Sequence, residues 1–343
     1  MNKLIKNKVL FYYNAPYYFH AQLAKSLDAD FLKAPRAKSN FSRALKLIYF
    51  ALKLPKKYPV YFCEDTYAIP ALAKKIGLIQ GKIITLTAAS LWYYFNKENN
   101  MNKVVKWCYI NLLKEVDIFI APSEMSKKFI DRIKPNAKVL VIPTCPSQQS
   151  KNHLLKIHNI IPNLNSHNIL LIANGPDSNH KGLDLLVKAF VKIKKKWPDA
   201  ELNIAGKWDK NQINNYTAYN NSIHFLGYVE DIYKLIKSSA LYVHLGRGDA
   251  FPASSIEAML GGLPSIVSIY TGTKEIVEQV DKKFVVSLNT TKVEKLINYY
   301  FLLSPKRKLE LSKKFFLAAA NKKYDEKYNL KKFKITLQKM LTN

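Results

Sequence analysis

The sequence predicts an α/β protein with two domains, each built on a parallel sheet covered by helices. The chain opens with an apolar run at 8–13 (KVLFYY), a helix beginning near Tyr17 and a second apolar run in DADFLKAP, which is the strand, helix, strand order of a parallel sheet. The same order restarts at 168–174 (NILLIAN), after a polar stretch punctuated by prolines over 144–167. A chain of 343 residues also exceeds what one core usually holds.

Short β-branched and aromatic runs predict the other strands. In the first domain these runs lie at 59–65, 82–87, 116–123 and 138–143, with helices expected at 39–57, 67–76, 101–115 and 124–133. In the second domain strands are expected at 201–206, 223–229, 240–245 and 263–268. The second domain's helices are expected over 182–198, from Asp231, around 256–259, from Glu275 and along the lysine-rich tail from Val293.

These elements divide the chain into an N-terminal domain at 1–150, a linker at 151–167 and a C-terminal domain at 168–320. A last helix at 321–343 is in a position to pack back on the first domain. Because ligands of parallel sheets bind at the carboxyl ends of the strands, the loops that follow the strands are the places to look for a site.

The chain is strongly basic, since 54 Lys and Arg residues against 25 Asp and Glu give a formal net charge of +29. A field of that sign attracts phosphate-bearing partners such as anionic lipid, nucleic acid or acidic polymers. Compositional bias of an AT-rich genome is an equal explanation, in which many lysines only solvate the surface. No motif for reading bases accompanies the charge, so a nucleic-acid partner is not expected.

The cysteines and histidines indicate neither a metal site nor a disulfide framework. Cys63, Cys108 and Cys145 are far apart, and no two of the seven histidines share a helical metal-binding spacing.

No apolar run reaches the roughly 18–20 residues of a membrane span. The run VLFYY near the N-terminus is better explained as a strand than as a secretion signal. We therefore expect a cytoplasmic protein that needs no metal.

The segment 39–57 has an apolar face opposed by basic residues. The apolar residues are Phe41, Leu45, Ile48, Tyr49 and Leu52, and the basic ones are Arg43, Lys46, Lys53, Lys56 and Lys57. Such a helix can lie in a membrane interface with its lysines toward anionic headgroups. The more ordinary alternative is a helix that packs its apolar face on the core and leaves its basic face in water. The first alternative would place the protein peripherally on the inner face of the cell membrane.

The stretch 246–278 (GRGDAFPASSIEAMLGGLPSIVSIYTGTKEIVE) concentrates polar residues and glycine turns inside an apolar region. Asp249 and Glu257 have seven residues between them, and serines at 254 and 255 offer N-cap chemistry for a short helix. A strand, the turn TGT and a new helix follow. This order aims backbone N–H groups at one point, which favours a phosphate oxygen, although plain loops of this kind are commoner.

A second candidate loop is NGPDSNHKG at 174–182, between the first strand and the first helix of the second domain. A lysine at such a helix start, Lys181, can reach a diphosphate whose other oxygens accept from local N–H groups. A surface lysine is the alternative in so basic a chain. The position of Lys181 after the strand is what singles it out.

At this point a family resemblance is visible. The runs HKGLDLLVKAF, ELNIAG, IHFLGYV, ALYVHL and DAFPASSIEAMLGGLPSIVSIYTGTKEIVE resemble the donor-binding domain of retaining family 4 glycosyltransferases. VDIFIAPSEMSKKFI followed by VLVIPT resembles the end of that family's first domain. The resemblance implies the GT-B fold, in which two Rossmann-like domains with parallel sheets face each other across a cleft and helices close the C-terminus.

The resemblance implies roles for the two acids. Glu257 would accept hydrogen bonds from the nucleotide ribose. Asp249 would contact the hydroxyls of the donor sugar and belong to the catalytic set with Lys181. The family normally has glutamate at the first position, so Asp249 is one methylene shorter.

For the diphosphate, the family uses an arginine and a lysine. Lys181 matches the lysine, whereas Pro176 stands at the arginine's position, and Arg247 is a candidate to supply the missing cation. The remaining donor-binding candidates are backbone groups at Gly175, Phe251, Pro252, Gly272 and Thr273. Of these, Gly272 and Thr273 would give N–H groups to the β-phosphate, and the amides around Phe251 and Pro252 would line the sugar.

The first domain departs further from the family, which commonly has a glycine-rich loop after strand one and a histidine after a middle strand. Here those places are NAPYYFH and TAASLWYY. The acceptor-side candidates are therefore Asn14, His20 and Ser90. For His20 and Ser90, a role unrelated to the acceptor is the more ordinary interpretation.

The resulting hypothesis is a glycosyltransferase that moves a sugar from a nucleotide diphosphate to an acceptor hydroxyl with retention. The acceptor would be a glycolipid, polysaccharide or glycan precursor. Stabilisation of the leaving diphosphate would supply most of the catalysis, and the scheme requires no metal. An inactive or accessory subunit that binds sugar nucleotides is the alternative, motivated by the shorter acid, the missing arginine and the missing histidine.

Overall fold

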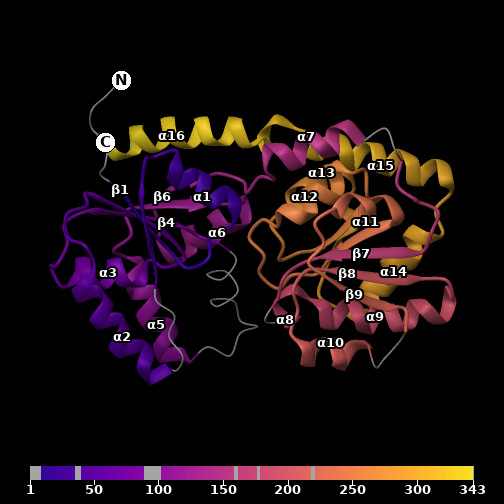
Figure 1. Cartoon of the computed structure of the whole chain (residues 1–343), viewed down its shortest axis with the longest axis horizontal. Coiled ribbons are helices and arrows are strands. Elements are labelled where there is room, and N and C mark those ends of the chain that lie inside the picture. The colour runs from indigo at the N-terminus through magenta and orange to yellow at the C-terminus, as the bar shows by residue number, and fades with distance from the viewer. Residues whose placement is uncertain are drawn as a thin grey trace. The chain divides into compact units, whose positions relative to one another are not determined.

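The computed structural model describes residues 9–34, 40–88, 102–157, 161–175, 178–217 and 221–342. The chain divides into two compact units (Figure 1). Unit 1 comprises Met1–Thr144 and Glu326–Asn343, and unit 2 comprises Cys145–Asp325. The chain therefore leaves unit 1 after Thr144, builds unit 2 and returns to unit 1 for its last helix.

Unit 1 contains a six-stranded sheet with the order β2-β1-β3-β4-β5-β6, in which every pairing is parallel. The strands are β1 (Val9–Tyr13), β2 (Asp30–Lys33), β3 (Val60–Glu64), β4 (Lys82–Leu86), β5 (Ile118–Ala121) and β6 (Lys138–Val141). β1, β3 and β5 are buried along almost their whole length. A strand covered on both faces needs apolar side chains at consecutive positions, which explains the apolar runs in the sequence.

Helices cover both faces of this sheet. They are α1 (Tyr18–Lys25), α2 (Asn40–Lys53), α3 (Ala68–Lys75), α5 (Lys103–Leu113), α6 (Glu124–Ile133) and α16 (Glu326–Thr342). Strand side chains alternate between the faces. On one face Tyr61 and Cys63 share a core with Ala51 of α2 and Ala71 of α3, and on the other the ring of Phe62 packs against Phe333 of α16.

Unit 2 repeats the plan with a second parallel sheet, in the order β12-β11-β10-β7-β8-β9. Its strands are β7 (Asn168–Ile172), β8 (Glu201–Ala205), β9 (Ile223–Gly227), β10 (Leu241–His244), β11 (Ser265–Ser268) and β12 (Val285–Val286). β10 lies between β7 and β11, so the loops that follow these three strands leave the sheet at neighbouring points.

The helices of unit 2 are α7 (Gln148–Ile157), α8 (Ser178–Lys181), α9 (Leu183–Lys196), α10 (Lys210–Thr217), α11 (Ile232–Ser238), α12 (Ala253–Leu260), α13 (Lys274–Val280), α14 (Thr290–Phe301) and α15 (Pro305–Ala319). Short 3-10 turns cover Lys282–Phe284 and Lys322–Tyr324. The predicted α/β class with two parallel sheets is confirmed. Within the described residues, no helix combines the length and apolar character that a membrane crossing requires.

Three elements differ from the sequence-based expectation. Residues 151–157, placed in a linker, form most of α7, and α7 packs on α12 inside unit 2. The Asn-rich stretch after β8 contains α10, and β12 is an additional short strand. α7 and α10 carry few apolar residues, so their helices have only a weak sequence signal.

Candidate active site

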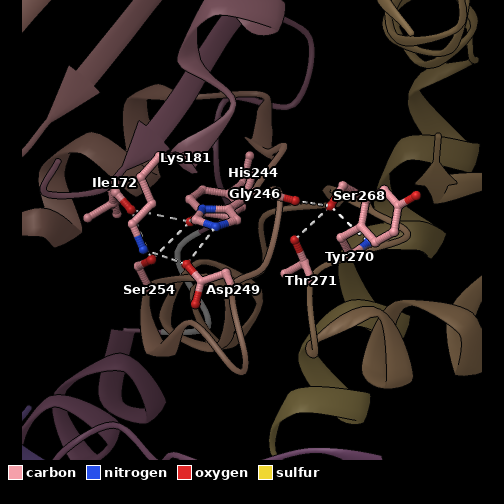
Figure 2. A network of polar contacts seen from close by, with 10 residues as sticks. Ile172, Lys181, His244, Gly246, Asp249, Ser254, Ser268, Tyr270 and Thr271 are labelled. Carbon is pink, nitrogen blue, oxygen red and sulfur yellow. Dashed lines mark hydrogen bonds and ion pairs between the residues drawn. The ribbon is translucent and has the colours of Figure 1, made fainter. Parts of the chain in front are cut away.

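The candidate site lies where the loops after β7, β10 and β11 leave the sheet of unit 2. Lys181 ends α8, in the segment between β7 and α9, and Asp249 follows β10. Because β7 and β10 are adjacent parallel strands, their following loops share one edge. The two residues therefore meet, although 68 positions separate them in the chain: Lys181 Nζ donates to Asp249 Oδ2 at 2.7 Å (Figure 2).

Asp249 is a buried carboxylate held by two donors. His244 Nε2 lies 3.0 Å from the same Oδ2 atom that Lys181 contacts. Burial alone would raise the pKa of Asp249, but the charge of Lys181 and the hydrogen bond to His244 hold the pKa well below its usual range. Figure 2 shows the other carboxylate oxygen directed away from both donors. Asp249 can therefore stay ionised while it offers an acceptor to a ligand hydroxyl.

His244 is a site residue that the sequence analysis missed. It is the last residue of β10 and is only 1% exposed. Its Nδ1 lies 3.4 Å from the hydroxyl of Tyr242, which is 3.0 Å from Ser254 Oγ, and Ser254 donates to the carbonyl of Ile172 at 3.0 Å. This chain of contacts (Figure 2) ties the imidazole to β7 and α12. A polar residue inside the apolar run ALYVHL was the available signal.

Two glycines allow the side chains to come together. Gly182 has φ +70°, and a Cβ added there would lie 2.0 Å from the carbonyl oxygen of Leu245, so the start of α9 approaches the end of β10 more closely than any side chain permits. A Cβ on Gly246 would lie 3.0 Å from Asp249 Cβ and 3.1 Å from His244 Nε2. Glycine at these positions lets Lys181, His244 and Asp249 occupy one small volume.

The TGT turn at 271–273 and the end of β11 hydrogen-bond to the loop that carries Asp249. Ser268 Oγ donates to the carbonyl of Gly246 and lies 3.0 Å from Thr271 Oγ1 (Figure 2). The N–H of Gly272 donates to the carbonyl of Asp249 at 2.8 Å. Of the two N–H groups expected to bind the β-phosphate, that of Gly272 is therefore already engaged within the protein. Thr273 is fully buried, and its hydroxyl has no partner among the described residues.

Arg247 points to a different partner. Its guanidinium makes a bidentate ion pair with Asp184 of α9, with distances of 2.7 Å and 2.8 Å, and it also donates to the carbonyl of Asn179. The pair fixes the loop after β10 to the start of α9. The structure thus gives Arg247 a bracing contact, and its expected role toward the diphosphate stays a prediction.

Glu257 lies on α12, and the structure gives it a different partner from those of the Lys181 cluster. Its Oε1 accepts a hydrogen bond from Ser150 Oγ of α7 at 2.8 Å, and Tyr233 donates to the same serine at 3.4 Å. Burial raises the pKa of Glu257, and the Ser150 hydrogen bond opposes the rise. The ring of Tyr233 stacks on His153 at 3.9 Å between centroids. α7, expected as linker, thus contributes directly to the surroundings of Glu257.

The other donor-side candidates are backbone positions. The N–H of Gly175 donates to the carbonyl of Lys207 at 3.2 Å. Phe251 is buried, with its ring 5.8 Å from that of Tyr324. Pro252 is the N-cap of α12 and has no N–H, so only its carbonyl is available to a ligand. The serine cap expected for this helix is wrong, because Ser254 lies inside α12 and bonds outward to β7.

The acceptor-side candidates belong to unit 1. His20 is buried, with Nδ1 2.5 Å from Glu64 and Nε2 3.2 Å from Thr144, so it links α1 to the end of β3 and to the segment after β6. Both ring nitrogens are engaged, as in a structural histidine. Asn14 is exposed in the turn after β1. Ser90 lies outside the described residues, as does Pro176.

Comparison with known proteins identifies a family match. Residues 156–314 match the family model "Glycosyl transferases group 1". A glycosyltransferase of Haemophilus influenzae, itself uncharacterised, is 23% identical over 319 residues, covering 86% of this chain and 87% of that protein. An uncharacterised glycosyltransferase of Methanocaldococcus jannaschii is 28% identical over 211 residues, covering 57% of this chain and 52% of that one.

Solved structures share the architecture. HepE of Anabaena, crystallised with UDP and glucose, superposes with a TM-score of 0.69 at 15% identity, covering 97% of this chain and 99% of HepE. Sucrose-phosphate synthase of Thermosynechococcus elongatus superposes with a TM-score of 0.71 at 15% identity, covering 98% and 100%. At such identities the likeness concerns the fold. The family match, the relatives and the fold together support a glycosyltransferase of the group 1 type with the GT-B architecture.

Proposed function

We propose that the chain transfers a sugar from a nucleotide-diphosphate donor to an acceptor hydroxyl with retention of anomeric configuration, as a hexosyltransferase of family 4. The observation that carries the proposal is the contact of Lys181 with the buried carboxylate of Asp249 at the edge of the sheet. HepE, which shares the fold, was solved with UDP and glucose, and this supports a nucleotide-sugar donor.

Each site residue has a role in this reaction. An ammonium has three N–H donors, so Lys181 can hold Asp249 with one and offer the others to the departing diphosphate. The leaving-group charge is what grows in the transition state, and a fixed cation in a dry site stabilises it strongly. Asp249 accepts from a sugar hydroxyl, and Glu257 accepts from the ribose hydroxyls.

The second half of the proposal concerns the acceptor and the location of the protein. We place a glycan or lipid-linked hydroxyl there, with its proton passing to the leaving phosphate oxygen, and we place the protein in the cytoplasm, peripherally on the inner face of the cell membrane. The scheme is written without a metal. Transfer that persists in EDTA would agree with this, and transfer restored only by a divalent cation would contradict it.

The decisive experiment compares two lysine variants with the wild type on a panel of sugar nucleotides. Thermal stabilisation, donor hydrolysis and transfer are measured, and the anomeric configuration of the product is determined by NMR. Lys181→Met should lower turnover by about 100-fold or more. Lys188→Met, an exposed position on α9, is the matched control and should change nothing. If no sugar nucleotide stabilises the wild type, the proposal is wrong.

The alternative of an accessory subunit is not favoured, because the relatives are glycosyltransferases and a paired lysine and carboxylate are present. The same experiment separates the two. Stabilisation by a sugar nucleotide, with neither hydrolysis nor transfer to any acceptor tested, would support the accessory role.

A further inference from the structure

Helix α2 of unit 1 is apolar on two sides. One side packs into the core, where Ala51 and Leu54 are buried and Leu47 lies against the same cluster. The opposite side carries Leu45, Ile48, Tyr49 and Leu52, which are 58%, 49%, 48% and 54% exposed. These four positions follow the i, i+3, i+4, i+7 spacing of a single helical stripe. Packing in the core explains the apolar residues on the first side, whereas the apolar residues on the second side are exposed to water.

Helix α5 presents a shorter stripe of the same kind. Val104 and Trp107 are 68% and 66% exposed, and they stand three residues apart on one side of the helix. α3 packs against both α2 and α5, so the three helices form one layer of unit 1 (Figure 1). The exposed apolar side chains thus belong to one outer layer, which we call the α2–α5 face.

The charges beside these stripes have one sign. Lys46 and Lys53 stand two turns apart along one flank of the α2 stripe, and Lys56 and Lys57 are exposed just beyond the helix. The Lys53 ammonium lies 4.6 Å above the Tyr49 ring. Neither α2 nor α5 contains an acidic residue. A partner for this face therefore has an apolar interior and an anionic rim.

We propose that the α2–α5 face docks on an anionic lipid bilayer, with the leucine and isoleucine side chains in the acyl boundary and the lysines at the headgroups. A helix lying in the interface needs this combination of exposed apolar residues and a basic flank. A nucleic acid would use the lysines but leave the apolar stripe in water. A second copy of the chain would bring the same positive charge against itself.

This inference rests on the peripheral membrane location proposed above, and it names the face of unit 1 that would contact the bilayer. Its test measures lipid binding and not sugar transfer, so the surface and the reaction can fail separately. The full chain is sedimented with vesicles of phosphatidylcholine alone and with vesicles that also contain phosphatidylglycerol, at low and raised salt. We expect binding to the anionic vesicles that weakens as salt rises.

Two variants separate the apolar and the charged contributions of the α2–α5 face to vesicle binding. The apolar variant, Leu45→Gln, Ile48→Gln and Leu52→Gln, should weaken binding to anionic vesicles by at least ~10-fold, since each change removes apolar surface that would leave water. The charge variant, Lys46→Gln, Lys53→Gln and Lys56→Gln, should abolish the preference for anionic vesicles. Circular dichroism and nucleotide-induced thermal stabilisation check that both variants are folded.

Matched controls use exposed residues of unit 2. Leu302→Gln with Leu317→Gln removes side chains that are 63% and 66% exposed, and Lys292→Gln, Lys295→Gln and Lys306→Gln removes three exposed lysines. Both controls should bind vesicles like the wild type. The proposal is overturned if the wild type ignores anionic vesicles or if the apolar variant binds them unchanged. A concentration-dependent dimer that only the apolar variant loses, without lipid binding, would assign the face to a second copy.

Discussion

At the scale of single residues, the site depends on how Asp249 is held. The family that the sequence resembles has glutamate at this position, and the shorter aspartate reaches less far from the backbone. In this chain His244 and Lys181 both bond to Oδ2, which fixes the carboxylate from two sides. We infer that His244 positions Asp249, so that the second oxygen keeps a constant direction toward the sugar.

The role of His244 can be tested by substitution. His244→Leu removes one donor to a buried carboxylate, and we expect kcat to fall about 10-fold to 100-fold, with little change in affinity for the free nucleotide. His244→Gln keeps an N–H donor and should recover much of the loss. His224→Gln, a partly exposed histidine paired with Glu201, is the control. Steady-state kinetics measures kcat, and calorimetry measures the affinity for the nucleotide. If His244→Leu lowered the nucleotide affinity and left kcat unchanged, the positioning role of His244 would be wrong.

The raised pKa of Glu257 leads us to expect that nucleotide affinity depends on pH. Burial raises its pKa, so it takes up a proton at a higher pH than an ordinary glutamate, whose pKa is about 4.3. A protonated carboxyl is a poorer acceptor for ribose hydroxyls, and nucleotide affinity should therefore fall as the pH is lowered through this raised pKa. Ser150→Ala removes a hydrogen bond that lowers the pKa and should move the fall to still higher pH.

Calorimetric titrations with a nucleoside diphosphate from neutral to mildly acidic pH measure this effect. Because the diphosphate also titrates in that range, each variant is compared with the wild type at every pH. Glu257→Gln should bind more weakly at neutral pH, and its affinity relative to the wild type should rise toward acid. A constant ratio between the two proteins at all pH values would show that Glu257 is not the titrating group.

The sequence located some of these residues and not others, for physical reasons. Lys181 and Asp249 were each singled out because they lie in loops that follow strands, and the family resemblance implied a common site for them. That the two loops share an edge depends on the pairing of β7 with β10, which the structure supplies. His244 sits in an apolar run whose other residues are core, so its polarity was the one local sign of a different role, and that sign does not say which group it contacts. The engaged N–H of Gly272 depends on the path of the Asp249 loop, which sequence spacing does not specify.

At the scale of secondary structure elements, most strands were predicted to within two or three residues because a strand buried on both faces needs an uninterrupted apolar run. α7 and α10 were missed since QQSKNHLLKI and KNQINNYT carry little apolar periodicity. Their helices are supported by packing, α7 on α12 and α10 on β9. The strands of unit 2 could thus be predicted, and the helix beside Glu257 could not.

The junction of α8 and α9 with β10 gives a prediction at this scale. Gly182→Ala forces an L side chain into φ +70° and into the Leu245 carbonyl, so the start of α9 must move and take Lys181 with it. We expect a loss of more than about 2 kcal/mol in the free energy of unfolding and a large loss of turnover. Gly227→Ala has a similar φ of +66° with open space around it, and should cost about 1 kcal/mol.

Chemical denaturation followed by intrinsic fluorescence, together with transferase assays, compares the two alanine variants. The comparison isolates the contact with β10, because backbone conformation is matched. Equal stability of the two variants, with turnover preserved in Gly182→Ala, would show that the close approach does not position Lys181.

At the scale of the whole molecule, the two units have separate cores. α16 packs in unit 1, although all of unit 2 lies between it and the rest of unit 1 in the sequence. Phe333 and Leu337 of α16 are fully buried. Phe333→Ala should lower the free energy of unfolding of unit 1 by about 3–5 kcal/mol, since it leaves a cavity against Phe62. Unit 2 and the nucleotide binding proposed for it should be unaffected.

Hydrogen exchange read by mass spectrometry can resolve the two units in one sample. Protection should fall over β1, β3 and the other strands of unit 1, while the strands of unit 2 keep theirs. Leu317→Ala, an exposed residue of α15, is the control. A uniform loss of protection across both units would mean that they unfold as a single cooperative body.

The return of α16 to unit 1 also sets an order for biogenesis. Unit 2 is continuous, so all of its residues have been synthesised once Asp325 has been added, whereas unit 1 still lacks its last helix. Domains generally fold as units, the N-terminal one first during synthesis. In this protein the N-terminal sheet, although translated first, can bury Phe62 under Phe333 only after α16 has been synthesised, which follows the synthesis of all of unit 2. The unit that is made first is therefore the one that is completed last.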